Sequence, residues 1–491
     1  MAITKSRLQA INTADAFRAR FGNDSIYAFI GRVTPYASSS SGSPLETRAE
    51  DIETWDGIYA LKKITLADVS HVLPVTTWSS GTYYDMYEHD VEMATADSTL
   101  SYFVTPTTGS DMAVYKCIND GSFGVCTGDQ STVDPMPSVG TSTTIPDNLA
   151  DNYRWKFMYV ISDYTDNKFY DGTWTPVSRT GGEGSLQASV AAAGVDGAIE
   201  HIKVTAVGSG YTSVPTVTIT GDGSGATAIA IVKGLTASSS SAMGSSSSSG
   251  FECADTSSSS SSAALSSSSS SAAPSCTEED NTVIEIIIIN GGSGYTNAEV
   301  TLSGGGGSGA AAKAIISPKW GHGYDPVNEL AANSIMVVAD FDGTEQDRIA
   351  ADADFHQIGL VVNPTTYGSK TIATGDVYDQ TVTLNIDDSG SGLTSGTYTE
   401  DTVITGDSSG ATGLVVEWTA TTASAGVLKL ANVDGTFESA ESINSTPAHT
   451  ITTITNPDLE PGSGEIIMID NISTVTRDPA QRDRIRFVLT F

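Results

Sequence analysis

The chain has 491 residues, enough for roughly three domains and a large buried core. It carries 24 Lys and Arg against 58 Asp and Glu, a net charge of -34, so most of its surface would repel a nucleic-acid backbone. Hydrophobic residues make up 39% while Gly, Ser and Thr are abundant, a mixture that favours short strands joined by tight turns. We therefore expect a mostly β protein that does not bind nucleic acid.

The first 180 residues are expected to be mostly β. Residues 1–20 can form a helix, with Phe17 and Phe21 on one face. A strand that runs into a turn is expected at 26–36, IYAFIGRVTPY, and further strands at 112–118, MAVYKCI, and 153–161, YRWKFMYVI. Pro- and Gly-marked loops separate these strands.

Two glycine-rich stretches of related sequence follow, at 208–232 and 291–316, about 84 positions apart. In each stretch apolar residues alternate with polar ones, which predicts strands with one buried face, and Gly allows the positive φ angles of sharp turns. We expect Tyr211 and Tyr295 each to cover a sheet face. Between the copies, residues 237–276 contain 22 serines in 40 positions, which is typical of a flexible connection.

The second half of the chain returns to strand patterns. A helical turn is expected after Asp325 and a strand at 335–339, followed by FHQIGLVVNP at 355–364. Residues 371–456 are again Thr- and Gly-rich and strand-like, and GEIIMIDN (464–471) and RIRFVLTF (484–491) predict two closing strands. We interpret the chain as a β-sandwich core with two inserted glycine-rich small β domains. The core would comprise 1–180, 318–370 and 457–491, and the insertions 181–317 and 371–456.

No segment predicts membrane insertion or secretion. The longest strongly apolar run, VIEIIII at 283–289, includes Glu285 and is too short to cross a bilayer. The start, MAITKSRLQAINTADAF, lacks the apolar region of a signal peptide, so we expect the protein to remain in the cytosol where it is made. Cys117 and Cys126 lack metal-ligand spacing and are expected to be buried thiols, while Cys253 and Cys276 could close a loop only if oxidised.

Residues 304–309, GGGGSG, formally match the dinucleotide-binding pattern G-x-G-x-x-G. That pattern needs a helix directly after it, and the following AAAKAIISP is too short. The sister copy, TGDGSGATAIAIV, loses the spacing and continues as a strand, so a structural turn is the favoured interpretation. We expect no nucleotide site and no cofactor.

Metal and catalytic signatures are equally weak. The histidines are dispersed, and neither a metal-binding cluster nor a G-x-S-x-G elbow occurs. Asp340 and Asp342 resemble only the start of a calcium loop, and for Asp222 and Asp407 turn capping is favoured over weak Ca²⁺ binding. The many carboxylates give no specific glycosidase pair. We predict no catalytic and no metal-binding residues, and a protein that is not an enzyme.

Aromatic residues gather in TWSSGTYYDMYEHD, at 77–90. Trp78, Tyr83, Tyr84 and Tyr87 could form a contact patch for a protein or a sugar. Packing of the loop onto a sheet explains them equally well. Both interpretations stay open from the sequence.

Several segments, in this order, resemble the baseplate wedge subunit of T4-like phages, of the gene-eight type. They are AFIGRVTPY, AVYKCI, YRWKFMYVI, FHQIGLVVNP, SGEIIMIDN and the terminal RIRFVLTF. The resemblance covers 1–180, 318–366 and 461–491, about half of the chain, and both glycine-rich segments lie outside it. Its signature positions are Gly31, Arg32, Pro35, Tyr36, Phe355, Gln357, Asn363, Pro364, Gly464, Glu465, Asn471 and Phe491.

This resemblance implies a β-sandwich virion protein of a contractile tail, assembled in the host cytoplasm. It would form a homodimer, bind other baseplate wedge subunits and have no catalytic activity. The insertions would leave the core at surface loops, because a buried loop would strand unpaired backbone groups. The alternative is a tail protein that binds a host receptor or carbohydrate, and a polysaccharide-cleaving enzyme is a third, weaker hypothesis.

Overall fold

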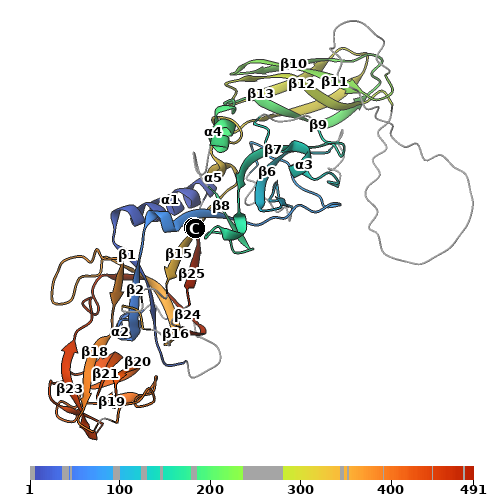
Figure 1. Cartoon of the computed structure of the whole chain (residues 1–491). Coiled ribbons are helices and arrows are strands. Elements are labelled where there is room, and N and C mark those ends of the chain that lie inside the picture. Colours follow the sequence, from blue (N-terminus) through green and yellow to red (C-terminus); the bar gives the residue numbers. More distant parts are fainter. Residues whose placement is uncertain are drawn as a thin grey trace, which may run out of the picture. The chain divides into compact units, whose positions relative to one another are not determined.

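The computed structural model, drawn in Figure 1, describes most of the chain. The described residues are 6–35, 44, 47–91, 100–122, 130–143, 148–177, 185–235, 280–342, 345, 348–350, 353–390, 392–444, 446–478 and 481–491. The chain divides into two units. Unit 1 comprises Met1–Val75, Thr165–Ser178 and Ala331–Phe491, and unit 2 comprises Thr76–Tyr164 and Arg179–Leu330. This division runs through the segment 1–180, which the sequence analysis treats as a single part of the core.

Unit 1 is built on two antiparallel sheets that share a core. In spatial order the larger sheet contains β17 (Val377–Asp379), β2 (Ile58–Ile64), β1 (Ile26–Gly31), β16 (Asp354–Val362) and β24 (Glu465–Thr476). The smaller sheet contains β25 (Asp483–Thr490), β15 (Ser334–Phe341), β3 (Val69–Pro74) and β8 (Trp174–Val177). The last two strands of the chain, β24 and β25, are therefore edge strands of the two sheets.

Strand β1 lies in the middle of the larger sheet and is buried along its whole length. Its side chains alternate between two apolar clusters, as the twofold period of a strand requires. Ile26 and Ile30 contact the core shared with the smaller sheet, and Tyr27 contacts a cluster on the opposite face that includes Trp55 of α2 (Arg48–Gly57). Both faces of the larger sheet are thus covered.

Helix α1 (Arg7–Asn23) packs onto the shared core. It begins after Ser6, whose hydroxyl accepts a hydrogen bond from the backbone N–H of Gln9 at 3.3 Å. Phe21 is buried, and the rings of Phe17 and Phe21 meet edge to face with centroids 5.3 Å apart. The expected helix and its aromatic face are confirmed.

A six-stranded sheet with its own core also belongs to unit 1. Its spatial order is β19 (Val403–Thr405), β20 (Thr412–Thr422), β21 (Ala425–Asp434), β18 (Val382–Asp388), β23 (Thr446–Thr455) and β22 (Ser442–Ile443). The core includes Leu384, Val415 and Leu428, each with no exposed surface. This sheet lies within the Thr- and Gly-rich segment 371–456, but the first strand of that segment, β17, belongs to the larger sheet.

Unit 2 contains a small sheet and a glycine-rich module. The small sheet consists of β4 (Phe103–Val104), β5 (Thr107–Thr108), β6 (Asp111–Asp120) and β7 (Tyr153–Ile161). Three short α-helices belong to the unit, α3 (Pro135–Val139), α4 (Ser185–Ala192) and α5 (Pro326–Glu329). Two 3₁₀ turns of the chain are η1 (Leu66–Asp68) and η2 (Tyr164–Asp166). The side chains of Trp155 and Phe157, on β7, are fully buried in the core that packs against this sheet.

We call residues 199–232 and 283–316 the glycine-rich module. Its strands are β9 (Ile199–Ser209), β10 (Thr216–Gly221) and β11 (Ser224–Val232) from the first copy, and β12 (Val283–Ser293), β13 (Ala298–Ser303) and β14 (Ser308–Ile316) from the second. Every long pairing joins one copy to the other: β9 with β14, β10 with β13 and β11 with β12. The two copies enclose one core and form a single body.

The fold class expected from the sequence is confirmed, because strands in several antiparallel sheets dominate the structure. Within the described residues no helix is long and apolar enough to span a bilayer. Among the described helices α1 is the longest, and the others are short.

Candidate functional site

Three of the signature positions lie side by side across the larger sheet. Gly31 of β1 is opposite Gln357 of β16, and Gln357 is opposite Asn471 of β24. The Gln357 amide Nε2 donates to Asn471 Oδ1 at 2.9 Å. A Cβ at Gly31 would lie 2.8 Å from the Gly57 carbonyl oxygen, so only glycine fits there. These residues fix strand register and form no cavity.

The turn after β1 has equally structural contacts. Arg32 has a φ of 59°, and its carbonyl oxygen accepts hydrogen bonds from the backbone N–H of His356 at 3.1 Å and from its Nδ1 at 2.9 Å. The Arg32 guanidinium pairs with Glu53 at 3.0 Å. Pro35 is exposed, and Tyr36 lies outside the described residues.

The signature around 363 and 464 joins three chain segments. Asn363 has a φ of 51°, and its Oδ1 accepts from the backbone N–H of Ser25 at 2.9 Å. Gly464 has a φ of 72°, and a Cβ there would lie 2.8 Å from Pro364 N. Glu465 begins β24 opposite Val362. These residues hold the ends of β16 and β24 together.

Two aromatic signature residues complete the set. Phe355 is 1% exposed in the shared core. Phe491 places its ring 5.3 Å from Phe17, and its backbone N–H donates to Asn333 O at 3.2 Å. Each described signature residue other than the exposed Pro35 therefore has a packing or hydrogen-bonding role, and the set does not converge on one site.

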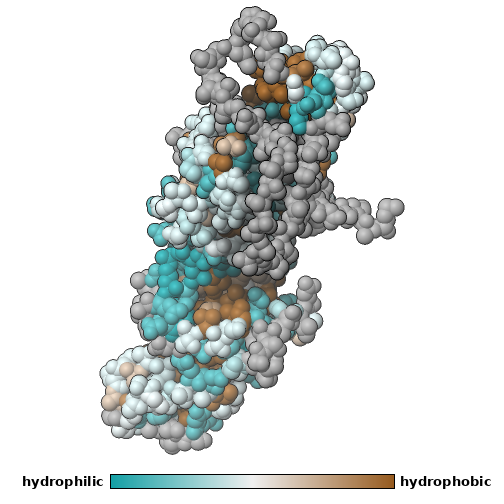
Figure 2. Space-filling view, turned by 90° about the vertical axis from the view of Figure 1, so that its right-hand side faces the viewer, coloured by the Kyte–Doolittle hydropathy of each residue, from teal (hydrophilic) through white to brown (hydrophobic). Residues whose placement is uncertain are grey.

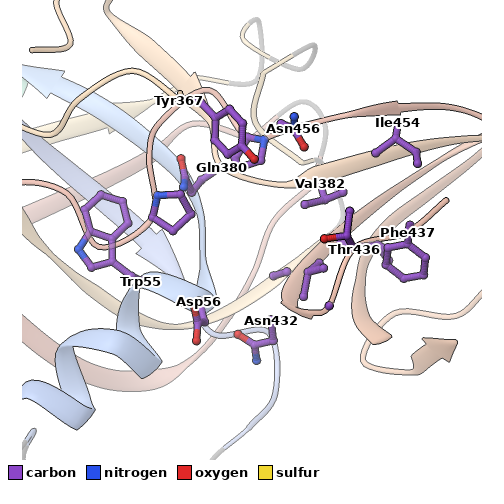
Figure 3. Close-up of a pocket in the computed structure, with 16 residues that line it drawn as sticks. Trp55, Asp56, Tyr367, Gln380, Val382, Asn432, Thr436, Phe437, Ile454 and Asn456 are labelled. Carbon is purple, nitrogen blue, oxygen red and sulfur yellow. The ribbon is translucent and has the colours of Figure 1, made fainter. Parts of the chain in front are cut away.

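A pocket of about 200 Å³ lies in unit 1 where α2 meets the six-stranded sheet (Figure 3). Trp55 and Asp56 at the end of α2 form one wall, and Tyr367 lies above the opening. Asn432 and Asn456 lie on opposite sides of the space. The remaining lining residues are Gln380, Val382, Leu430, Ala431, Val433, Gly435, Thr436, Phe437, Ile454, Pro457 and Pro461.

The pocket offers hydrogen-bonding groups but little reactivity. Burial and the nearby Asp434 raise the pKa of Asp56. The Gln380 amide is already used, because Nε2 donates to Leu459 O at 3.1 Å and Oε1 accepts from Leu459 N at 3.3 Å. Exposed Asn432 and Asn456 supply the amides that a polar ligand could reach. Such a set can bind a neutral, hydroxyl-bearing ligand but provides no nucleophile with an adjacent base.

A second cluster, buried in unit 2, brings several charged side chains together. The Lys116 ammonium contacts Glu329 Oε2 at 2.6 Å and lies 4.2 Å from the centroid of the Tyr87 ring. Glu329 Oε1 also accepts from the backbone N–H groups of Gly323 and Asp325. Although burial alone would raise it, the Lys116 charge lowers the pKa of Glu329 to about 2. Glu329 is therefore held as a carboxylate.

His322 and Glu200 extend this charged cluster. His322 Nε2 lies 3.1 Å from Glu200 Oε2, and Nδ1 lies 3.5 Å from Glu329 Oε2. Burial, together with the Lys116 charge, lowers the pKa of His322 to about 3, whereas burial raises the pKa of Glu200 to about 7. The Lys116 and Glu329 side chains are 0% and 3% exposed, so the cluster braces the interior and is closed to a substrate.

The glycine motif GGGGSG forms the turn between β13 and β14. Tyr211, from the other copy, covers this turn, and a Cβ at Gly307 would lie 2.6 Å from its ring. In the same way Tyr295 covers the turn that contains Gly223, with a corresponding distance of 2.5 Å. Both tyrosines are buried, but each lies against a turn of the other copy, whereas the sequence suggested that it could cover a sheet face. An aromatic ring fills the space that a phosphate would need.

The acidic turn residue Asp222 caps a neighbouring turn. Its Oδ1 accepts from the backbone N–H groups of Thr296 and Asn297 at 2.9 and 3.0 Å. Hydrogen bonding from Thr296, first of all from its side chain, lowers the pKa of Asp222. Asp340 pairs with Arg482 and Arg484. Within the described ranges no three His, Cys, Asp or Glu residues come together in a way that could hold a metal ion.

The aromatic segment 77–90 packs largely inward. Tyr84 and Tyr87 are 4% and 9% exposed and belong to the core of the small sheet. Trp78 is partly buried, and its Nε1 donates to Ser131 Oγ at 3.0 Å. Cys117 is also buried there, as expected, while Cys126, Cys253 and Cys276 lie outside the described residues. The packing interpretation accounts for these aromatic residues.

Neither a protein-family model nor a curated protein matches the sequence of this chain. The pocket and the charged cluster were missed by sequence reasoning, because their residues come from segments far apart in the chain. One available signal was the unusual Lys116 within an otherwise apolar strand pattern, VYKCI.

Proposed function

We propose that this chain is a structural subunit of a contractile-tail phage baseplate wedge, which acts in assembly and host-triggered rearrangement through protein–protein interfaces. The proposal rests on the resemblance of its core segments and on the geometry of its last two strands. In it the protein has no catalytic activity, lies in the virion and forms a homodimer that binds other wedge subunits.

The observation that carries the proposal is that β24 and β25 are each the last strand of their sheet among the strands that the structure describes. Among the described strands none pairs with the outer edge of either, although β24 extends from Glu465 to Thr476. Soluble monomers rarely leave long edges open, because unpaired backbone groups recruit another chain. Such an edge suits a protein that works inside an assembly.

Side chains along these edges support the same proposal. Ile467 and Ile472 of β24 and Ile485 and Leu489 of β25 pack against the shared core but are only partly buried. A groove of about 550 Å³ runs beside Ile466–Ile469 and is lined on the other side by the start of α2. Apolar side chains next to an open edge would add buried area to a strand-mediated contact.

The test is the mass of the purified chain in solution, measured by light scattering alone and after mixing with the other wedge proteins of the same phage. We expect a dimer that joins a larger complex. The variant Ser473→Lys, which places a charge at an exposed residue of β24, should weaken the complex, whereas Val403→Lys, at a side chain that is 62% exposed in β19, should not. A chain that ignores those proteins under all conditions would contradict the proposal.

The pocket of Figure 3 favours a second candidate function, binding of a host-surface carbohydrate. Aromatic rings next to amide side chains are suited to sugar hydroxyls and their apolar ring faces. Binding of host lipopolysaccharide or its oligosaccharides to the isolated chain, lost in Tyr367→Ala and Asn456→Ala, would support it. If the wild type and both variants bind the oligosaccharide with identical saturation curves, the pocket is not the carbohydrate-binding site.

A further inference from the structure

Lys116 and Glu329 form an ion pair that is closed to solvent. Figure 2 shows hydrophilic side chains spread over the surface of the chain, where water solvates them. The side chains of Lys116 and Glu329, by contrast, are 0% and 3% exposed, and the Lys116 Nζ lies 2.6 Å from Glu329 Oε2. The Tyr87 ring covers the ammonium, with its centroid 4.2 Å away. Two opposite charges are therefore held in contact in an apolar interior, where each carries a large cost of desolvation.

Backbone donors hold the second oxygen of the Glu329 carboxylate. Oε1 accepts hydrogen bonds from the backbone N–H of Gly323 at 2.8 Å and from that of Asp325 at 3.2 Å. Fixed N–H groups aimed at one oxygen of an acyl group stabilise the negative charge that develops there when a nucleophile attacks the carbon. The amine of Lys116 lies beside the other oxygen of the same carboxylate. A nucleophile and an oxyanion-stabilising pair thus face one carboxyl group.

A proton carrier lies beside the oxygen that contacts the ammonium. His322 Nδ1 is 3.5 Å from Glu329 Oε2, and the His322 ring meets the Tyr87 ring edge to face with centroids 4.9 Å apart. Its Nε2 lies 3.1 Å from Glu200 Oε2, so a carboxyl group orients the imidazole. Burial, together with the Lys116 charge, lowers the pKa of His322, so the ring is neutral and can take up and pass on a proton.

We propose that Lys116 and Glu329 become joined by an intramolecular isopeptide bond, which the chain forms by itself once it has folded. The Lys116 ammonium first passes one proton to Glu329 Oε2. The free amine then attacks Cδ, so the Nζ–Cδ bond forms and negative charge develops on Oε1. A second proton passes from Nζ through His322 to Oε2, the Cδ–Oε2 bond breaks, and Oε2 leaves as water. One hydrogen stays on the amide nitrogen, and the reaction consumes no oxidant, reductant or co-reactant.

Burial favours the amide over the ion pair. In water the separate ions are the stable form, because water solvates both charges. In the closed cluster, formation of the amide removes two buried charges at once, and a neutral amide is much less costly to bury than an ion. Because the fold already holds Nζ against the carboxylate, the entropic cost of bringing the two groups together has been met before the reaction begins.

The bond would close a long loop of the chain. Lys116 lies in β6 and Glu329 is the last residue of α5, 213 positions later, and the glycine-rich module lies between them in the sequence. A cross-link over this separation lowers the entropy of the unfolded chain, as a disulfide does, but does not depend on redox conditions. The inference concerns bonds within the chain and is independent of the proposed function.

Intact-mass spectrometry of the purified full-length chain, under denaturing conditions, tests the inference. We expect the wild-type mass to be lower than the sequence mass by one water, and a protease digest to contain a branched peptide that joins Lys116 to Glu329. The double variant Lys116→Met, Glu329→Leu replaces both charges with apolar side chains of similar size, so it can fold and should show its full sequence mass. His322→Gln keeps both reacting groups and should contain the bond in a smaller fraction of freshly made chains.

The pair Lys203 and Glu88 is an internal control, because its Nζ and Oε1 are also 2.6 Å apart but the Lys203 side chain is 36% exposed. No branched peptide should join these two residues. Thermal melting establishes that the wild type and each variant are folded. A folded wild-type chain with its full sequence mass would overturn the inference, as would a mass decrease that persists in the double variant. Undiminished cross-linking in His322→Gln would contradict the proton path through that ring.

Discussion

At the scale of single residues, the glycines of the module are explained by the tyrosines of the opposite copy. Gly307 is next to Tyr211, and Gly223 is next to Tyr295, at distances that leave no room for a Cβ. The glycines therefore serve close packing of a ring on backbone. A phosphate-binding loop uses glycine for a different reason, because its backbone N–H groups must face an empty space.

We expect Gly307→Ala to lower the free energy of unfolding by about 2–3 kcal/mol, the usual cost of forcing extra volume into a packed site. Its Cβ would lie 2.6 Å from both the Ser209 carbonyl oxygen and the Tyr211 ring. Gly304→Ala is the control, because its Cβ would meet nothing within 4 Å and only its φ of 79° is strained. It should cost about 1–2 kcal/mol. Urea unfolding measures both, and equal effects would contradict the packing argument.

The buried carboxyl of Glu200 predicts a pH effect of definite sign. Its pKa in the folded chain, about 7, is above the ordinary value, so the folded state holds the proton more tightly than the unfolded state. Stability from this group is complete at pH values below about 4.5 and is lost as the pH rises through about 7. The side chain introduced by Glu200→Gln cannot ionise, so this variant should not show this loss of stability as the pH rises.

The comparison is made by urea unfolding between about pH 5 and pH 8. The free energy of unfolding of the wild type relative to Glu200→Gln should fall across this range by an amount on the order of 1–3 kcal/mol. Glu299→Gln, on exposed β13, serves as the control and should follow the wild type. Parallel curves for the wild type and Glu200→Gln would show that the carboxyl is not protonated in the fold.

At the scale of elements, the sequence predicted which segments are strands better than it predicted how they pair. β7 matches the expected 153–161 because aromatic residues at every second position, followed by the β-branched Val160 and Ile161, define it. β24 extends five residues beyond the expected end, to Thr476, because pairing of Thr476 with Asp354 overrides the polar sequence. The pairing of strands between the two glycine-rich copies could not be predicted from local patterns. Apolar and polar residues alternate in the same way in both copies, so the alternation does not show which strands pair.

In the two copies, equivalent pairs of backbone N–H groups donate their hydrogen bonds to different acceptors. In one, the carboxylate of Asp222 accepts from Thr296 N and Asn297 N. In the other, the carbonyl oxygen of Gly305 accepts from Thr212 N and Ser213 N at 2.8 and 3.1 Å. The second copy has one additional residue in this turn, GGGG in place of GDG. A carboxylate in one copy and a backbone carbonyl in the other thus accept hydrogen bonds from equivalent pairs of N–H groups.

This equivalence predicts that the turns are exchangeable. Deletion of Gly306 together with Gly305→Asp should leave the melting temperature close to that of the wild type, because the new carboxylate takes over both hydrogen bonds. Deletion of Gly306 alone should lower the melting temperature, since the donors lose their acceptor. Calorimetry of the two variants measures the difference. Equal melting temperatures would mean that the acceptor has no effect on stability.

At the scale of the whole molecule, the signature residues and the edge strands belong to one sandwich. Gln357, Asn471 and Phe491 hold β16, β24 and α1 in place, and no other described strand pairs with the outer edge of the same β24. The sequence predicted the closing strands, but spacing alone could not predict that both would be edges. The sequence did not predict the pocket of Figure 3 either, because Trp55 and Asn456 are far apart in the chain and only the fold brings them to the same pocket.

Hydrogen exchange of the backbone amides of β24 and β25 tests the central claim most directly. It is measured on the chain alone and in its complex with the other wedge proteins. The account predicts that amides along the outer edges of Glu465–Thr476 and Asp483–Thr490 exchange freely in the chain alone and become protected in the complex. Unchanged exchange in both strands, with protection elsewhere or nowhere, would contradict the claim that these edges are the assembly interface.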